Sequence, residues 1–123
     1  MTTVPKSMRA SVLVDKQTVE MQERPVPAAA AGEVLVQVRS VGVCGSDVHY
    51  YRDGRIGDFV VREPLILGHE VSGVVVDVGA DVPETRIGER VAIEPQRPCR
   101  RCRHCRRQCE GFAPFPPFPP VLS

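Results

Sequence analysis

Four side chains of different chemistry lie within six positions near the middle of the chain. They are the thiol of Cys44, the hydroxyl of Ser46, the carboxylate of Asp47 and the imidazole of His49. A second polar cluster, Gly68-His69-Glu70, follows nineteen residues after His49, and valine-rich runs adjoin both clusters. Thiolate, imidazole and carboxylate groups converging from two segments are what a catalytic zinc site needs.

Each of these residues also has an ordinary structural explanation. A lone cysteine after a strand is more often a small buried hydrophobic residue, and a His-Glu pair is often only a surface pair. The combination favours a metal site, with Cys44, His69 and Glu70 as its ligands. Asp47 is expected to hold the ligating histidine by its second ring nitrogen. Ser46 and His49 are candidates for passing a proton between the metal site and solvent.

A separate cysteine cluster near the C-terminal end predicts a structural zinc site. The spacing is C-x2-C-x2-C-x3-C, formed by Cys99, Cys102, Cys105 and Cys109. Clustered cysteines in a reducing compartment are more often zinc ligands than disulfides. Six arginines between positions 97 and 107 permit another interpretation, a zinc knuckle that binds nucleic-acid phosphates. The window has no aromatic residue to stack a base, so a solvated basic loop is the favoured interpretation.

Composition indicates one soluble domain with no global preference for a charged partner. The chain has 123 residues, 42% of them hydrophobic and 25% charged, with a net charge of +1. No apolar run is long enough to span a membrane, and the N-terminus lacks the apolar core of a signal peptide. We therefore expect a cytoplasmic protein whose partners include neither nucleic acid nor membrane.

The elements that must position these residues are mostly strands. Alternating or valine-rich segments predict strands at residues 8–14, 17–21, 33–43, 71–78 and 89–93. Residues 46–52 predict a helical turn with Ser46 or Asp47 as its N-cap, while residues 24–32 and 53–58 are predicted as linker and loop. Short strands separated by turns indicate a mainly β fold, a small barrel or sandwich. No G-x-G-x-x-G motif follows a strand, so a nucleotide-binding Rossmann domain is not expected in these residues.

Four motifs, in order, resemble the start of the zinc-dependent medium-chain alcohol dehydrogenases. They are C-G-S-D-V-H from Cys44, P-L-I-L-G-H-E from Pro64, I-G-E-R-V-A-I-E-P from Ile87 and C-R-R-C-R-H-C from Cys99. The resemblance covers roughly residues 8 to 107, and its nearest branch is the polyol group of sorbitol, xylitol and arabinitol dehydrogenases. It implies a GroES-like β-barrel over residues 1–111, then a cysteine-rich loop and a Pro/Phe-rich tail at residues 112–123.

The resemblance also implies a role for each matching residue. Cys44, His69 and Glu70 match the catalytic zinc ligands, Asp47 the carboxylate behind the histidine, and Ser46 and His49 the proton relay. Tyr50 matches a residue of the substrate pocket, as does Phe59. The implied reaction is oxidation of a polyol or secondary alcohol by NAD(P), with zinc polarising the substrate hydroxyl.

Two departures from the family limit this expectation. The gap before Cys109 is three residues where the family has seven, and no family motif follows Cys109. The match ends before a nicotinamide-binding half, so we expect a truncated chain without hydride transfer of its own. The alternatives are a stand-alone zinc-binding barrel that acts as a binding module, and the basic zinc knuckle.

The tail has three phenylalanines at a period of three among its prolines. In a polyproline II helix this period places Phe112, Phe115 and Phe118 on one edge. The tail is therefore either a docking peptide or, as the favoured interpretation, a disordered end produced by an aberrant reading of the coding sequence.

Overall fold

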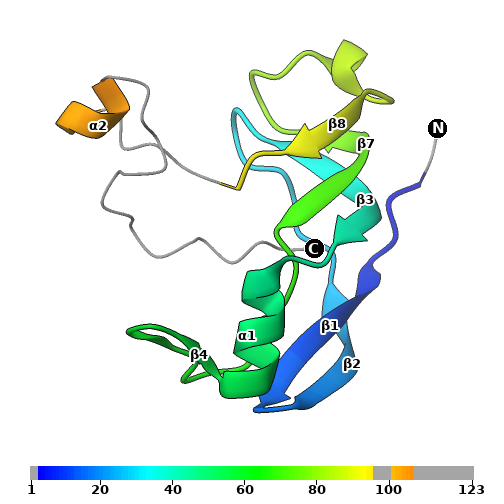
Figure 1. Ribbon diagram of the computed structural model, residues 1–123. Coiled ribbons are helices and arrows are strands. Elements are labelled where there is room, and N and C mark those ends of the chain that lie inside the picture. Colours follow the sequence, from blue (N-terminus) through cyan, green and yellow to red (C-terminus); the bar gives the residue numbers. More distant parts are fainter. Residues whose placement is uncertain (1–2, 96–100, 107–123) are drawn as a thin grey trace.

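Two small antiparallel sheets form the framework of the protein. A computed structural model describes residues 3–95 and 101–106 (Figure 1). The first sheet has the strand order β2-β1-β6 and the second has the order β3-β7-β8. A two-stranded hairpin pairs β4 with β5. The strands are β1 (Ser7–Asp15), β2 (Thr18–Pro25), β3 (Val34–Gly42), β4 (Arg55–Ile56), β5 (Phe59–Val60), β6 (Leu65–Ile66), β7 (Glu70–Val78) and β8 (Arg90–Ile93).

Helical structure is limited to short elements. α1 (Gly45–Asp53) follows β3 directly, η1 (Glu84–Arg86) is a single 3₁₀ turn, and α2 (Arg103–Arg106) is one α-helical turn. None of the helices in the described residues has the length and apolar character that a membrane span requires. Every strand pairing in the described residues is antiparallel, which confirms a mainly β fold without a parallel nucleotide-binding sheet there.

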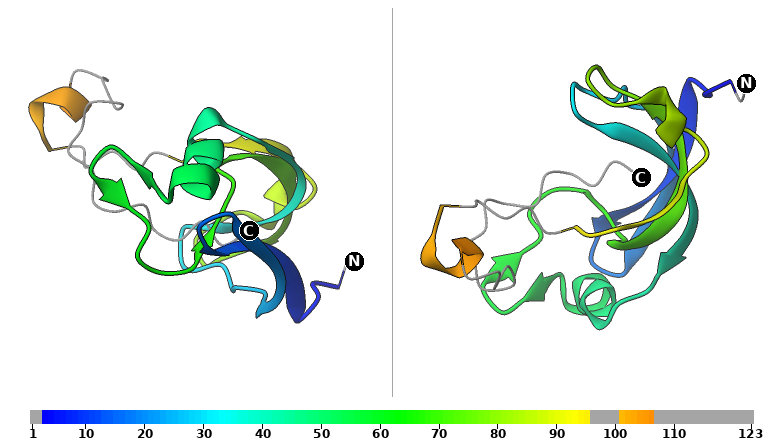
Figure 2. Two further views of the ribbon diagram at one scale, coloured as in Figure 1. Left: turned by 60° about the horizontal axis from the view of Figure 1, so that its bottom comes forward. Right: turned by 90° about the horizontal axis from the view of Figure 1, so that it is seen from above.

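The hydrophobic core is formed mainly by β1 and β7. β1 is the central strand of its sheet and is buried on both faces, so its neighbouring residues Val12 and Leu13 are both inaccessible to solvent. β7 is the central strand of the other sheet and alternates, burying Val71 and Val75. Burying one such aliphatic side chain contributes about 1.5–3 kcal/mol. Figure 2 shows both sheets from two further directions, with β3 and β7 curving past β1.

The predicted strands are confirmed, with corrections at their ends. β2 extends to Pro25, in the segment predicted as a linker. Proline is compatible with this strand because β2 lies at the edge of its sheet, where a missing N–H donor breaks no ladder bond. The predicted loop at residues 53–58 contains β4 and leads into β5 across a tight turn. The N-cap of α1 is Cys44, not Ser46 or Asp47, because the extended backbone of Cys44 precedes the first helical residue.

Several predicted features lie outside the described residues. These are Cys99, Cys109, the boundary at residues 111–112 and the tail at residues 112–123. The division into a domain of residues 1–111 and a tail therefore stays a prediction.

Candidate metal centre

The pairing of β3 with β7 brings the two ligand-bearing segments together. In the antiparallel register, Gly42 at the end of β3 lies opposite Glu70 at the start of β7. Cys44 follows two residues after Gly42, and His69 directly precedes Glu70. The same end of one ladder therefore carries all three predicted ligands, and α1 begins there (Figure 1).

The ligand atoms of Cys44, His69 and Glu70 lie within 4.8 Å of one another. Cys44 and His69 are half-buried, whereas Glu70 is exposed. Zinc bonds of about 2.0–2.3 Å separate the ligands of a tetrahedral site by roughly 3.6 Å, so a small contraction would complete the site. One sulfur, one nitrogen and one oxygen donor match a catalytic zinc site, which keeps a fourth position for water or substrate.

Asp47 contacts both of the segments that carry the candidate ligands. Its carboxylate oxygen Oδ2 accepts a hydrogen bond from the backbone N–H of Cys44 at 3.0 Å. Its other oxygen, Oδ1, lies 3.6 Å from Nδ1 of His69, a distance of electrostatic contact but too long for a hydrogen bond. Nδ1 thus faces a carboxylate, and Nε2 is the nitrogen left for a metal. Asp47 is 8% exposed, and it is the charged residue that is buried among the described residues.

Two glycines avoid close contacts beside the candidate ligands, and sequence reasoning missed their roles. A Cβ atom on Gly42 would lie 2.6 Å from Oε2 of Glu70, so only glycine leaves room for that carboxylate across the ladder. Gly68 has a φ of +108°, and a Cβ there would lie 2.8 Å from Cγ1 of Val41. Gly42 comes two residues before Cys44, and Gly68 comes directly before His69. This placement is the signal in the sequence.

The far end of α1 is fixed by the turn between β1 and β2. The backbone N–H of Gln17 donates to the carbonyl of Tyr51 at 2.8 Å, and its side-chain amide reaches the carbonyl of Arg52 at 3.5 Å. Gly54, in the left-handed conformation, ends the helix with a bond to Tyr50. Gln17 was not among the predicted site residues, because a contact across thirty-five positions leaves no local pattern.

The predicted relay and pocket residues lie on α1 and β5. Ser46 is half-buried and His49, one turn later, is 57% exposed, with Nδ1 at 3.4 Å from Oδ2 of Asp53. Tyr50 is half-buried, whereas Phe59 is 75% exposed. The helix places Ser46 and His49 on one face, since residues three apart are neighbours. Their catalytic roles stay predictions.

Little of the second cysteine cluster falls within the described residues. Cys102 is half-buried, and its carbonyl accepts a hydrogen bond from the N–H of Arg106 at 3.1 Å. A helical turn therefore spans this part of the cluster, and Cys105 lies within it. The four-cysteine zinc site stays a prediction.

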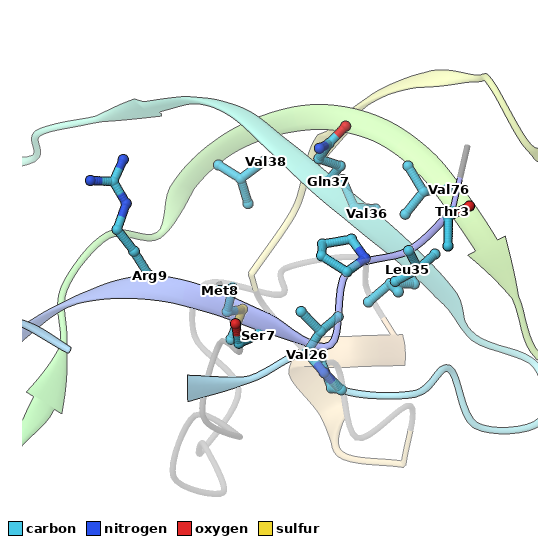
Figure 3. A pocket seen from close by; sticks show the side chains of 13 residues that line it. Thr3, Ser7, Met8, Arg9, Val26, Leu35, Val36, Gln37, Val38 and Val76 are labelled. Atoms are coloured by element: carbon cyan, nitrogen blue, oxygen red, sulfur yellow. The ribbon is translucent and has the colours of Figure 1, made fainter. Parts of the chain in front are cut away.

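A hollow of about 290 Å³ lies away from these residues, between β1 and the pair β3 and β7 (Figure 3). Its walls are largely apolar and include Met8, Val26, Leu35 and Val76. None of the three candidate ligands lines it, so it is not part of the metal centre.

Comparison with known proteins identifies the family of this fold and site. Residues 30–116 match the model of the alcohol dehydrogenase GroES-like domain. Sorbitol dehydrogenase of Bacillus subtilis is 46% identical over 97 residues, covering 79% of this chain and 28% of that protein. Sorbitol dehydrogenase of Gallus gallus is 56% identical over 78 residues, covering 63% of this chain and 22% of that protein.

A solved structure agrees with the sequence relatives. The short chain alcohol dehydrogenase rspB of E. coli CFT073, complexed with NADH, superposes with a TM-score of 0.75 at 35% identity, covering 86% of this chain and 30% of that one. The chain thus spans less than a third of the length of these proteins. It belongs to the family of the alcohol dehydrogenase GroES-like domain.

Proposed function

We propose that this chain supplies the zinc-binding domain of an oxidoreductase that oxidises a polyol or secondary alcohol with NAD(P). The observation that carries the proposal is the convergence of Cys44, His69 and Glu70, with ligand atoms within 4.8 Å, in front of the buried carboxylate of Asp47. The similarity to two sorbitol dehydrogenases supports a polyol as the substrate. The NADH-bound structural relative supports a nicotinamide cofactor.

The chain's own residues hold the reaction centre in position. Bound zinc would act as a Lewis acid toward the substrate hydroxyl, favouring its deprotonated form. Asp47 fixes the backbone of Cys44 and faces the ring of His69, so it sets the orientation of two ligands at once. Gly42 leaves the space that Glu70 occupies. Tyr50 and Phe59 are proposed to contact the carbon chain of the substrate.

Ser46 and His49 are proposed to carry the released proton to solvent. The hydroxyl of Ser46 is half-buried beside Asp47, whereas the imidazole of His49 is 57% exposed. Nδ1 of His49 lies 3.4 Å from Oδ2 of Asp53. Ser46 and His49 lie one turn apart on one helical face, the first half-buried and the second exposed, which supports this role.

The 123 residues are proposed to bind metal without completing hydride transfer. They contain no G-x-G-x-x-G motif to hold the pyrophosphate of a dinucleotide. The proposed partner is a small-molecule alcohol, not nucleic acid or membrane. The thiolate ligand requires reducing surroundings, which supports the cytoplasm as its compartment.

Metal analysis of purified variants tests the site. We expect Cys44→Ala and His69→Ala each to lose one equivalent of zinc, and cobalt-loaded wild-type protein to show a thiolate-to-metal absorption band that Cys44→Ala lacks. His49→Ala is the matched control, because this imidazole belongs to the same segment but not to the ligand set, and it should keep full zinc content. If Cys44→Ala and His69→Ala retain the zinc of the wild-type protein, the proposed metal centre is wrong.

A further inference from the structure

β2 is a long edge strand with one free side in the described part of the chain. β1 pairs with it in a regular register from Ser7 opposite Pro25 to Leu13 opposite Val19, and no other described strand pairs with it. Seven of its eight residues are exposed, including Met21 at 63%. An exposed edge of this length is a template for another strand.

The hydrogen-bonding direction of each residue in β2 follows from the ladder. Val26 donates its N–H to the carbonyl of Lys6 at 3.0 Å, which continues the β1–β2 pairing by one residue. Because hydrogen-bonding direction alternates along a strand, even-numbered residues of β2 bond to β1 and odd-numbered residues point outward. The N–H and C=O groups of Val19, Met21 and Glu23 therefore point to the outer edge, where no described strand pairs with them. Pro25 also points outward, where its missing N–H is tolerated.

One face of β2 carries an ordered row of opposite charges. Glu20, Gln22 and Arg24 lie on the same face because side chains alternate along a strand. The amide of Gln22 donates to Glu20 at 3.2 Å, and Arg24 donates to the amide oxygen of Gln22 at 2.7 Å. Glu20 and Arg24 thus lie two positions before and two positions after Gln22 in the chain.

We propose that β2 pairs antiparallel with β2 of a second copy of this chain, about a two-fold axis through Gln22. In this register Met21 and Glu23 of each copy exchange backbone hydrogen bonds, and the N–H of Val19 reaches the carbonyl of Pro25. Glu20 of each copy lies directly opposite Arg24 of the other, in the non-hydrogen-bonded positions where side chains are nearest. The two sheets then join into one.

Charge complementarity selects this register over its neighbours. Only registers with odd-numbered residues opposite each other use the outward N–H and C=O groups. An axis through Met21 sets Glu20 opposite Gln22 and leaves the charges unpaired. An axis through Glu23 sets the two Glu23 carboxylates against each other, which is unfavourable. The register about Gln22 pairs both charges of each copy.

Charge reversal on β2 tests the proposal through the oligomeric state. Sedimentation equilibrium of the 123-residue chain should show a reversible monomer–dimer equilibrium. Glu20→Arg or Arg24→Glu alone sets like charges opposite each other twice, and should raise the dissociation constant about tenfold, since cross-strand pairs contribute about 0.2–1 kcal/mol each. The double variant Glu20→Arg/Arg24→Glu restores opposite charges and should recover dimerisation. Arg62→Glu and Glu63→Arg, exposed and away from β2, are the matched controls.

A single proline substitution distinguishes pairing at the outer edge of β2 from the pairing of β2 with β1. Met21→Pro removes an outward N–H and should abolish the dimer while circular dichroism and zinc content stay unchanged. A chain that stays monomeric at every concentration overturns the proposal. So does a dimer that ignores the single charge reversals or that the double variant fails to restore. These readouts are independent of metal binding, so the dimer and the metal centre succeed or fail separately.

Discussion

The carboxylate of Asp47 contacts both segments of the proposed metal centre. One oxygen holds the backbone before α1 through Cys44, and the other faces the ring of His69. A buried carboxylate is unfavourable without partners, so its 8% exposure indicates that these two contacts compensate for lost hydration. The residue is well placed in the sequence because position N3 of a helix favours an acid that reaches back to the N-cap backbone.

Replacement of Asp47 should weaken zinc binding without removing a ligand. Asp47→Asn keeps an acceptor for the N–H of Cys44 but loses the negative charge beside His69, and Asp47→Ala loses both. Partners of this kind typically change metal affinity 10–100-fold, so we expect a loss in that range, larger for alanine. Competition with a chromophoric chelator measures the affinity. Asp53→Asn, at the exposed end of the same helix, should bind zinc like the wild-type protein; equal losses at both positions would contradict the role of Asp47.

At the scale of elements, the β3–β7 register decides which side chain faces which. Gly42 lies opposite Glu70. The carboxylate of Glu70 occupies the space that a side chain at position 42 would fill. Bulges between Leu35 and Val36 and between Val38 and Ser40 shift the pairing along the ladder. The two shifts are equal and opposite, so Gly42 lies opposite Glu70 in the same register that pairs Val34 with Val78.

Gly42→Ala should displace Glu70 and lower zinc affinity. The added methyl would lie 2.6 Å from Oε2 of Glu70, closer than any stable contact. We expect a loss of zinc affinity of up to about tenfold, because the exposed and flexible carboxylate of Glu70 must leave its position near the other ligand atoms. Gly45→Ala is the matched control, because a Cβ there meets nothing within 4 Å. If the effect acts through the carboxylate, Gly42→Ala should cause no further loss in a Glu70→Ala background; an additive loss would point to a general disturbance of the ladder.

The strands could be predicted from the sequence because alternating valines leave a local pattern in β3 and β7. The residue types of Cys44, His69 and Glu70 made them candidate ligands, and the structure brings these three residues together. The pairing of Gly42 with Glu70 could not be predicted, because no local pattern in the sequence states which residue of β3 lies opposite which residue of β7. The continuation of β2 through Pro25 was missed for a related reason, since the effect of proline depends on whether the strand lies at an edge. The contact of Gln17 with α1 is set by tertiary structure alone.

At the scale of the molecule, the described residues bury few large side chains for a chain of this length. The buried hydrophobic residues among them are Ala10, Val12, Leu13, Val71 and Val75. Val43 and Phe59 are 78% and 75% exposed, so apolar surface remains in contact with water. Stability from the core alone is therefore expected to be small.

Zinc should make a large contribution to the stability of the folded chain. The ligands come from two segments that meet only in the folded state, so metal binding favours that state by RT ln(1 + [Zn]/Kd), about 2.7 kcal/mol when free zinc is 100 times Kd. For a domain near this size such a gain raises the melting temperature by roughly 10 °C or more. We expect a chelator to lower the melting temperature of the wild-type protein by this amount and to change that of Cys44→Ala much less. Equal sensitivity of the two proteins would assign the stabilising metal to the cysteine cluster near the C-terminal end. A wild-type melting temperature unchanged by the chelator would contradict zinc binding to the folded chain, because a ligand that binds only the folded state must stabilise it.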